Sequence, residues 1–244
     1  KSKKNKKKEK DYAMAEEKVL TGYPSIDKPH YKYYREKPIR EINVNQTIYE
    51  LVFNSNKDYL DAPALEYMGV NWTYRKLKSE TDRAADAFSK AGLKQGDVVL
   101  LGVSNCLESV VSLLALNKLG VISKWFDIRA SHKDILEYVN DSECRFLIMF
   151  NVLLPKVQEI VDKTSLEKIL VISPVDLLSW PIQLAYSLKT KKEGNNYRLP
   201  NDKRYIKFAD FIKEGENFSK VECIPFDKER PSVMIQSSGT TGKP

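Results

Sequence analysis

Residues 98–126 read VVLLGVSNCLESVVSLLALNKLGVISKWF, and this stretch decides the fold. Its first part, Val98 to Val103, is a continuous apolar run with the length of one strand. Leu107 to Leu119 has helical spacing, and Gly120 follows where a glycine commonly ends a helix. Val121 to Phe126 can extend as a second strand. A strand, a helix and a strand in this order predict one unit of a parallel sheet.

The same alternation continues on both sides of that stretch. Residues 76–91 have helical spacing that Gly92 closes, and Ser131 is a plausible N-cap for a helix through Tyr138. Further predicted elements are a strand at Phe146 to Phe150, a helix at Leu154 to Val161 and a strand at Ile169 to Ile172. Four of the strands are apolar throughout. The sequence therefore predicts an α/β fold, a parallel sheet with helices on both faces.

The last residues form a candidate phosphate-binding loop. Pro231 to Gln236 is predicted to be a short buried strand, and residues 237–244 follow it as SSGTTGKP. The two glycines let the backbone approach a ligand with its N–H groups, the hydroxyls add donors and the lysine adds a mobile charge. Open α/β sheets bind ligands at such strand ends. The candidate residues are Ser237, Ser238, Gly239, Thr240, Thr241, Gly242 and Lys243.

Two alternatives bear on this loop. A cluster of serine, threonine and glycine is by default a solvated turn, and the motif SSGTTG taken alone leaves that alternative open. A Walker loop is disfavoured, because Ser237 occupies its first glycine position and Pro244 stands where its magnesium-binding hydroxyl belongs.

All positions of residues 237–244 match the phosphate-binding signature of the adenylate-forming superfamily, which includes acyl-CoA synthetases, luciferases and peptide-synthetase adenylation domains. Upstream, NWTYRKL at 71–77, GLKQGDVV at 92–99 and LALNKLGV at 114–121 resemble further segments of that family. Lys76 departs from the pattern, since an acid is usual there. The resemblance covers most of the chain.

One segment resembles a particular branch of the superfamily. Asp127-Ile128-Arg129 stands where the family commonly has a V-P-L-N-P run. Together with TGYPSIDKP at residues 21–29, it is similar to a bacterial type of acyl-CoA synthetase.

The resemblance implies an ATP-dependent acid–thiol ligase. The carboxylate of a fatty or other simple acid would attack the α-phosphate of ATP, and coenzyme A would take the acyl group from the resulting acyl-adenylate. The resemblance thus implies ATP, Mg²⁺ and coenzyme A. Three cysteines without disulfide or C-x-x-C spacing are separately typical of a cytoplasmic protein. Ser237, Ser238, Thr240 and Thr241 would donate to the β- and γ-phosphates, and Lys243 would stabilise pyrophosphate. Such catalysis rests on alignment and charge neutralisation rather than on a nucleophilic side chain.

In that family the catalytic, ribose-binding and magnesium-binding residues follow the phosphate loop. The resemblance therefore implies that catalytic residues lie downstream of Pro244 and that these 244 residues are an N-terminal portion inactive alone. The alternatives are an amino-acid adenylating domain that charges a carrier protein and a non-catalytic nucleotide-binding module. Neither the acid nor the oligomeric state can be predicted.

The net charge of +7 comes mostly from one segment. Residues 1–10 contain seven lysines and one glutamate, a net +6, which leaves +1 for the rest. We expect a solvated tail and no specific nucleic-acid partner, although a polyanion-binding role for the tail is a further alternative. The expected organisation is a basic disordered tail at 1–12, an extension at 13–70, an α/β subdomain at 71–230 and the strand and loop at 231–244.

The remaining signals are negative or ambiguous. Cys106, Cys144 and Cys223 have no metal or disulfide spacing, which favours reduced thiols, and His30 and His132 are not assigned to catalysis. No metal site can be drawn from the three cysteines. No apolar stretch approaches 18 residues, so no transmembrane span is predicted.

Residues 175–189 are apolar and aromatic. They suggest an amphipathic surface helix or an acyl-chain lid, but a helix packed on the domain or a mobile connection is favoured, with Pro181 as an interruption. Residues 189–196 are predicted to be a polar loop.

Overall fold

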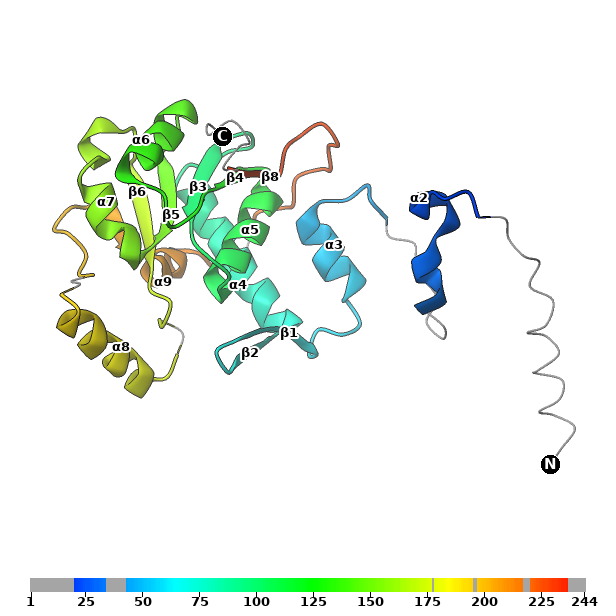
Figure 1. Ribbon diagram of the computed structural model, residues 1–244, viewed down its shortest axis with the longest axis horizontal. Coiled ribbons are helices and arrows are strands. Elements are labelled where there is room, and N and C mark those ends of the chain that lie inside the picture. Colours follow the sequence, from blue (N-terminus) through cyan, green and yellow to red (C-terminus); the bar gives the residue numbers. More distant parts are fainter. Residues whose placement is uncertain (1–19, 34–42, 177, 195–196, 217–219, 237–244) are drawn as a thin grey trace, which may run out of the picture. The chain divides into compact units, whose positions relative to one another are not determined.

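The computed structural model describes residues 20–33, 43–176, 178–194, 197–216 and 220–236 (Figure 1). The chain divides into two compact units, residues 1–42 and 43–244. The described part of the first unit contains helix α2, Pro24–Asp27, and the 3-10 helix η1, Pro29–Tyr33. The carboxylate of Asp27, at the end of α2, fixes the backbone that precedes this helix. It accepts hydrogen bonds from the backbone N–H groups of Thr21 and Gly22, both at 2.9 Å.

The second unit is built on a six-stranded parallel sheet with the strand order β7-β6-β5-β3-β4-β8. Its strands are β3 Val98–Gly102, β4 Ile122–Trp125, β5 Phe146–Phe150, β6 Lys168–Ile172, β7 Tyr205–Lys207 and β8 Val233–Ile235. A separate antiparallel hairpin joins β1 Pro63–Tyr67 to β2 Val70–Thr73. The predicted α/β fold with a parallel sheet is confirmed.

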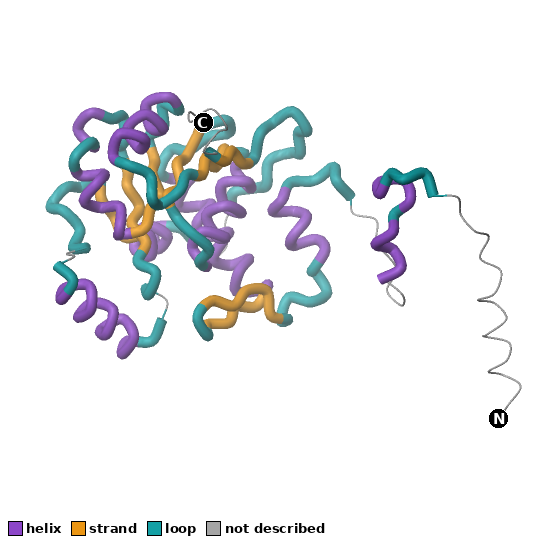
Figure 2. The backbone as a smooth tube through the Cα atoms, in the orientation of Figure 1, coloured by secondary structure: helices purple, strands orange, loops and turns teal. Residues whose placement is uncertain are grey.

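Helices alternate with these strands and cover both faces of the sheet (Figure 2). The helices of the second unit, in the part that the structure describes, are α3 Ile48–Ser55, α4 Tyr74–Lys90, α5 Leu107–Leu119, α6 His132–Asp141, α7 Leu154–Gln158, α8 Trp180–Lys192 and α9 Phe208–Phe211. Three 3-10 segments complete the order, η2 Asn151–Leu153, η3 Val161–Lys163 and η4 Ile212–Glu214.

Local sequence signals set several of the helix ends. Ser131 begins α6 with a capping box, in which its hydroxyl accepts from the backbone N–H of Asp134 at 3.2 Å and Asp134 accepts in return at 2.9 Å. Gly120 ends α5 with a φ of 68°, the left-handed conformation that glycine adopts without strain. The predicted helix at residues 154–161 ends early, because the chain tightens into η3 after α7.

Two apolar clusters form the core, one on each face of the sheet. Successive strand residues point to opposite faces, so Leu100 and Leu147 belong to one cluster and Leu101 and Ile148 to the other. The first cluster includes residues of α6 and α7, and the second includes residues of α4, α5 and α9. Burial on both faces explains why the central strands are continuously apolar.

Three expectations need correction. The strand at Pro231 to Gln236 was expected to be buried, but in β8 Ile235 is 76% exposed, because β8 pairs only with β4 among the described residues. Pro181 does not interrupt a helix; it lies in the first turn of α8, where no backbone N–H is required. The predicted polar loop from Lys189 is helical through Lys192.

Two expectations from the sequence are not tested by the structure. The basic tail at residues 1–12 lies outside the described residues, and the expected domain boundaries stay predictions. No helix in the described part of the chain is both long enough and apolar enough to cross a bilayer.

Candidate functional site

Strand β8, which precedes the candidate phosphate loop in the sequence, ends at the carboxyl edge of the parallel sheet. Ile235 of β8 stands in register with Trp125 of β4, and the backbone N–H of Gln236 donates to the carbonyl of Trp125 at 2.9 Å. Gln236 therefore lies beside the last residue of β4. This is the edge at which α/β sheets bind ligands. The predicted loop residues themselves, Ser237, Ser238, Gly239, Thr240, Thr241, Gly242 and Lys243, lie outside the described residues.

A buried amide fixes the start of the strand that leads into the loop. The side chain of Asn117 in α5 donates to the hydroxyl of Ser232 at 3.1 Å and accepts from the backbone N–H of Tyr49 at 2.9 Å. Ser123 of β4 donates its backbone N–H to the carbonyl of Ser232 at 3.1 Å. Sequence analysis did not single out Asn117 or Ser232. The signal that could have indicated Asn117 is an amide that directly follows the apolar run at residues 113–116 in α5.

An exposed ion pair follows β4 at the same edge. The guanidinium of Arg129 donates to both carboxylate oxygens of Asp127 from Nε at 3.0 Å, and the backbone N–H of Arg129 donates at 2.8 Å. These hydrogen bonds lower the pKa of Asp127 to about 2. The pair is thus fully charged at neutral pH, and it follows Trp125, the residue whose carbonyl accepts the hydrogen bond from Gln236. Sequence analysis treated these residues as a branch marker and not as part of the site.

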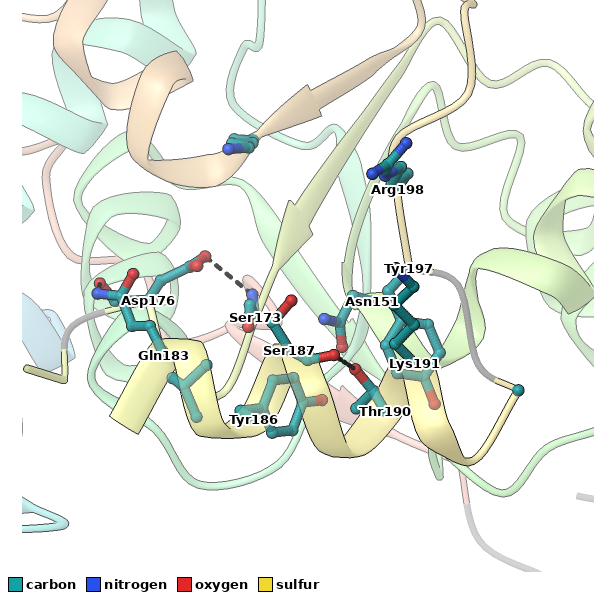
Figure 3. Close-up of a pocket in the computed structure, with 13 residues that line it drawn as sticks. Asn151, Ser173, Asp176, Gln183, Tyr186, Ser187, Thr190, Lys191, Tyr197 and Arg198 are labelled. Atoms are coloured by element: carbon teal, nitrogen blue, oxygen red, sulfur yellow. Dashed lines mark hydrogen bonds between the residues drawn. The ribbon is translucent and has the colours of Figure 1, made fainter. Parts of the chain in front are cut away.

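A pocket of about 670 Å³ lies at the other end of the same sheet edge, between α8 and the segments that follow β5, β6 and β7 (Figure 3). It is lined by Asn151, Ser173, Val175, Asp176, Gln183, Tyr186, Ser187, Thr190, Lys191, Gly194, Tyr197, Arg198 and Lys207. With neighbouring strands about 4.8 Å apart, three to four strand steps separate β5 and β6 from β8, roughly 14–19 Å. The pocket and the end of β8 are therefore separate parts of one edge.

Polar groups give the pocket its character. Asp176 accepts a hydrogen bond from the backbone N–H of Ser173 at 3.0 Å, while burial raises its pKa. The buried side-chain oxygen of Asn151 has no hydrogen-bond partner among the described residues. Lys191 and Lys207 bring positive charge. These groups suit a polar ligand that carries a negative charge and a hydrogen-bond donor.

The described residues offer neither a metal cluster nor a reactive thiol. No group of three or more His, Cys, Asp or Glu side chains among them could hold a metal ion, so Mg²⁺ is assigned no ligand here. Burial raises the pKa of Cys106 and Cys144 to about 12, and burial also raises the pKa of Cys223. All three thiols are free in the structure, and none is activated as a nucleophile.

The model of the AMP-binding enzyme family matches residues 52–244. The chain belongs to that family. Its matched region contains the whole parallel sheet and ends with the phosphate-loop sequence. Family membership therefore confirms the resemblance on which the expected chemistry rests.

Curated relatives of this AMP-binding chain are CoA ligases and CoA synthetases. A long-chain-fatty-acid–CoA ligase of Bacillus subtilis (strain 168) is 26% identical over 231 residues, which cover 92% of this chain and 38% of the relative. A long-chain-fatty-acid–CoA ligase of Salmonella typhimurium (strain LT2) is 31% identical over 83% of this chain and 36% of the relative. An acetyl-coenzyme A synthetase of Helicobacter acinonychis (strain Sheeba) is 26% identical over 92% and 34%. The chain thus spans about a third of the length of these relatives.

Solved structures of CoA ligases share the fold. The anthranilate CoA ligase AuaEII, in complex with anthranoyl-AMP, superposes with a TM-score of 0.66 at 21% identity over 83% of this chain and 34% of that chain. A long-chain-fatty-acid–CoA ligase from Archaeoglobus fulgidus gives a TM-score of 0.62 at 14% identity, over 84% and 37%. At these identities the likeness concerns the fold alone.

Proposed function

We propose that the protein is an ATP-dependent acid–thiol ligase, which adenylates a carboxylic acid and transfers the acyl group to coenzyme A. The observation that carries the proposal is the octet at residues 237–244, which in a chain of the AMP-binding family directly follows β8 in the sequence. The end of β8 at the carboxyl edge of the sheet supports a ligand-binding role for that octet. The names of the curated relatives support a fatty or other simple acid as substrate.

The proposed roles follow from the charge of the reactants. Carboxylate and triphosphate are both anionic, so the attack on the α-phosphate requires donors and cations that are already in place. The hydroxyls of Ser237, Ser238, Thr240 and Thr241 would donate to the β- and γ-phosphates, the backbone at Gly239 and Gly242 would approach them, and Lys243 would neutralise the departing pyrophosphate. Mg²⁺ would accompany the phosphates of ATP.

Two further statements belong to this proposal. The 244 residues by themselves would not turn over, because they span only about a third of the relatives' length. The protein would work in the cytoplasm, since the free thiols suit a reducing compartment.

The test is pyrophosphate release by the complete gene product with ATP, Mg²⁺ and a panel of fatty, aromatic and amino acids, each with and without coenzyme A. We expect acid-dependent release, and thioester only when coenzyme A is present. Lys243→Ala should lower the rate about tenfold or more, whereas the exposed Lys228→Ala should not. Thioester formed only on a carrier protein would favour the amino-acid adenylating alternative. Bound ATP without any release would favour a non-catalytic nucleotide-binding module.

A further inference from the structure

The pocket between α8 and the sheet edge, called the α8 pocket below, contains a buried acceptor without a donor. Asn151, the first residue after β5, is only 6% exposed, yet its side-chain oxygen has no hydrogen-bond partner among the described residues. Leaving a buried polar atom unpaired is costly, so a partner is expected. Asn151 lines the pocket, and Figure 3 shows it near the last turns of α8, where Tyr197 and Lys191 also lie. A ligand of the pocket should therefore bring a hydrogen-bond donor to this oxygen.

The connections of the sheet diverge at this pocket. After β5 the chain enters α7, whose Leu154 and Val157 belong to the first apolar cluster. After β7 it enters α9, whose Phe208 and Phe211 belong to the second cluster, on the opposite face. Strand β6 lies between them and leads into α8. Open α/β sheets bind ligands outside the carboxyl ends of strands whose connections leave toward opposite faces.

Hydrogen bonds hold the wall that α8 contributes. The side-chain amide of Gln183 donates to the carbonyl of Leu178 at 2.8 Å and to that of Asp176 at 3.2 Å. The carboxylate of Asp176 in turn accepts from the backbone N–H of Ser173, at the end of β6, at 3.0 Å. Leu178 is itself buried. The first turn of α8 is thus fixed to the sheet edge, as expected of a pocket that exists before its ligand binds.

The charges of the lining favour an anion. The pocket is lined by three cationic side chains and one carboxylate, Lys191, Arg198, Lys207 and Asp176. Three positive charges less one negative charge leave a formal net charge of +2. The acid that follows α8, Glu193, lies 3.9 Å from the ammonium of Lys189, which is not part of the lining. A phosphate monoester carries about −1.5 to −2 at neutral pH and would balance this charge, whereas a carboxylate supplies a single charge.

Hydrogen-bonding capacity favours the same group. Five hydroxyls join the cations as donors in the lining, those of Ser173, Tyr186, Ser187, Thr190 and Tyr197. A phosphate offers three strong acceptor oxygens to such donors. The oxygen of Asn151 and the carboxylate of Asp176 need the opposite, a donor from the ligand. A phosphate on a carbon skeleton with hydroxyl groups supplies both.

We propose that the α8 pocket binds a phosphate monoester whose carbon skeleton carries hydroxyl groups. The positive lining attracts the phosphate, with Lys191 and Lys207 as its contacts, and a ligand hydroxyl donates to the oxygen of Asn151. The pocket volume of about 670 Å³ lies in the range of small-molecule sites. Sugar phosphates and nucleoside monophosphates share this chemistry. The proposal rests on the pocket and not on the ligase chemistry.

The experiment is equilibrium dialysis of the complete protein with radiolabelled glucose 6-phosphate, and in parallel with radiolabelled AMP. We expect saturable binding of one of the two at least about tenfold tighter than that of methyl phosphate, which has no hydroxyl group, or of glucose, which has no phosphate. The tighter of the two labelled probes distinguishes a sugar phosphate from a nucleotide as the source. Absence of saturable binding by both overturns the proposal.

Two pairs of lysine variants locate the bound phosphate. Lys191→Gln with Lys207→Gln should weaken binding of the labelled probe at least about tenfold, because two charge-assisted contacts are lost. The matched control is Lys189→Gln with Lys192→Gln, which removes the same charge from residues of α8 that do not line the pocket and should bind as the wild type does. Equal losses in the two pairs would show a general effect of charge and would overturn the proposal.

Asn151→Leu tests the buried acceptor. It should lower the affinity for the labelled probe about tenfold while leaving the affinity for methyl phosphate unchanged, because only the hydroxyl loses its partner. An equal loss for both compounds would mean that the amide only supports the fold, and an unchanged preference would mean that it meets no ligand. Either result overturns the proposed contact.

Phosphate compounds can also bind to the candidate phosphate loop, so Lys243→Ala completes the set. Binding of the labelled probe that is retained in Lys243→Ala and lost in the Lys191/Lys207 variant supports the proposal. The reverse pattern assigns the bound phosphate to the loop and overturns it. Neither pattern alters the test of the ligase, which measures pyrophosphate release.

Discussion

Replacing Asp82 with alanine should remove the centre of a buried polar network that joins three helices. The carboxylate of Asp82 in α4 accepts hydrogen bonds from the hydroxyl of Tyr49 in α3 at 2.6 Å and from the ammonium of Lys118 in α5 at 2.9 Å. A third donor, the ammonium of Lys78, lies at 2.6 Å. Lys118 is only 5% exposed, so without Asp82 its charge stays desolvated and unpaired.

The expected loss of unfolding free energy depends on which hydrogen-bond donors remain without a partner. Removing one partner of a buried ion pair costs about 3–5 kcal/mol. Lys78 is half exposed and can turn to water, which leaves mainly Lys118 and Tyr49 without a partner, so we expect the low end, about 3 kcal/mol. With a urea dependence of about 2 kcal/mol per molar, the midpoint of urea unfolding should fall by roughly 1.5 M.

The assay is equilibrium urea unfolding, followed by circular dichroism, of the wild type and of Asp82→Ala. The matched control is Asp61→Ala, which breaks the exposed ion pair with Arg75, whose Nε lies 2.8 Å from the carboxylate. We expect little change in this control, because exposed pairs contribute little. A midpoint for Asp82→Ala equal to that of the control would refute the reasoning.

The pH dependence provides a second check on the same residue. Burial raises the pKa of Asp82, but the hydrogen bonds from Lys118, Lys78 and Tyr49 outweigh it, and the net shift is downward. A lowered pKa in the folded state means that the stabilisation is present above the unfolded value of about 3.9 and is lost as the pH falls through the folded value. The stability difference between the wild type and Asp82→Asn should therefore shrink below about pH 4.

Three further predictions concern packing, capping and thiol reactivity. Gly102→Ala should cost about 1–3 kcal/mol, because the added methyl group would lie 2.4 Å from the ring of Phe126, and a shift of the urea midpoint measures it. Ser131→Ala removes the hydroxyl that caps α6 and should cost about 1 kcal/mol in the same assay; an unchanged midpoint would show that the capping box adds nothing. Burial raises the pKa of Cys144 to about 12, so its alkylation by iodoacetamide at pH 8 should occur only after urea unfolding; rapid modification of the native thiol would contradict this.

The sequence was most informative where local signals agree with burial. The bounds of α5 and β5 match the prediction, because a glycine ends the helix and an uninterrupted apolar run marks a strand covered on both faces. Ser131 was likewise identified as the N-cap of α6, since capping depends on residues three apart in the chain. For the same reason the loop octet could be recognised, although its conformation lies outside the described residues.

The sequence was least informative where contacts are distant along the chain. Nothing local joins Asp82 to Lys118, which are 36 residues apart, or Asn117 to Ser232, which are 115 apart. The predicted burial of β8 was wrong, because apolar content does not show whether a strand lies at the centre or the edge of a sheet. Pro181 was misjudged, because its effect depends on whether it begins the helix or lies within it.

The sequence by itself determined the fold class and the family, because hydrophobic spacing and consecutive motif residues are properties of the local chain. The phosphate-binding role of the loop octet stays a prediction. Only the tertiary structure decided the strand order, the amide that fixes the start of β8, and the exposure of the apolar residues of α8. A helical pattern fixes which residues share a face. Which face meets the core and which meets the surroundings is decided by the elements that pack against it.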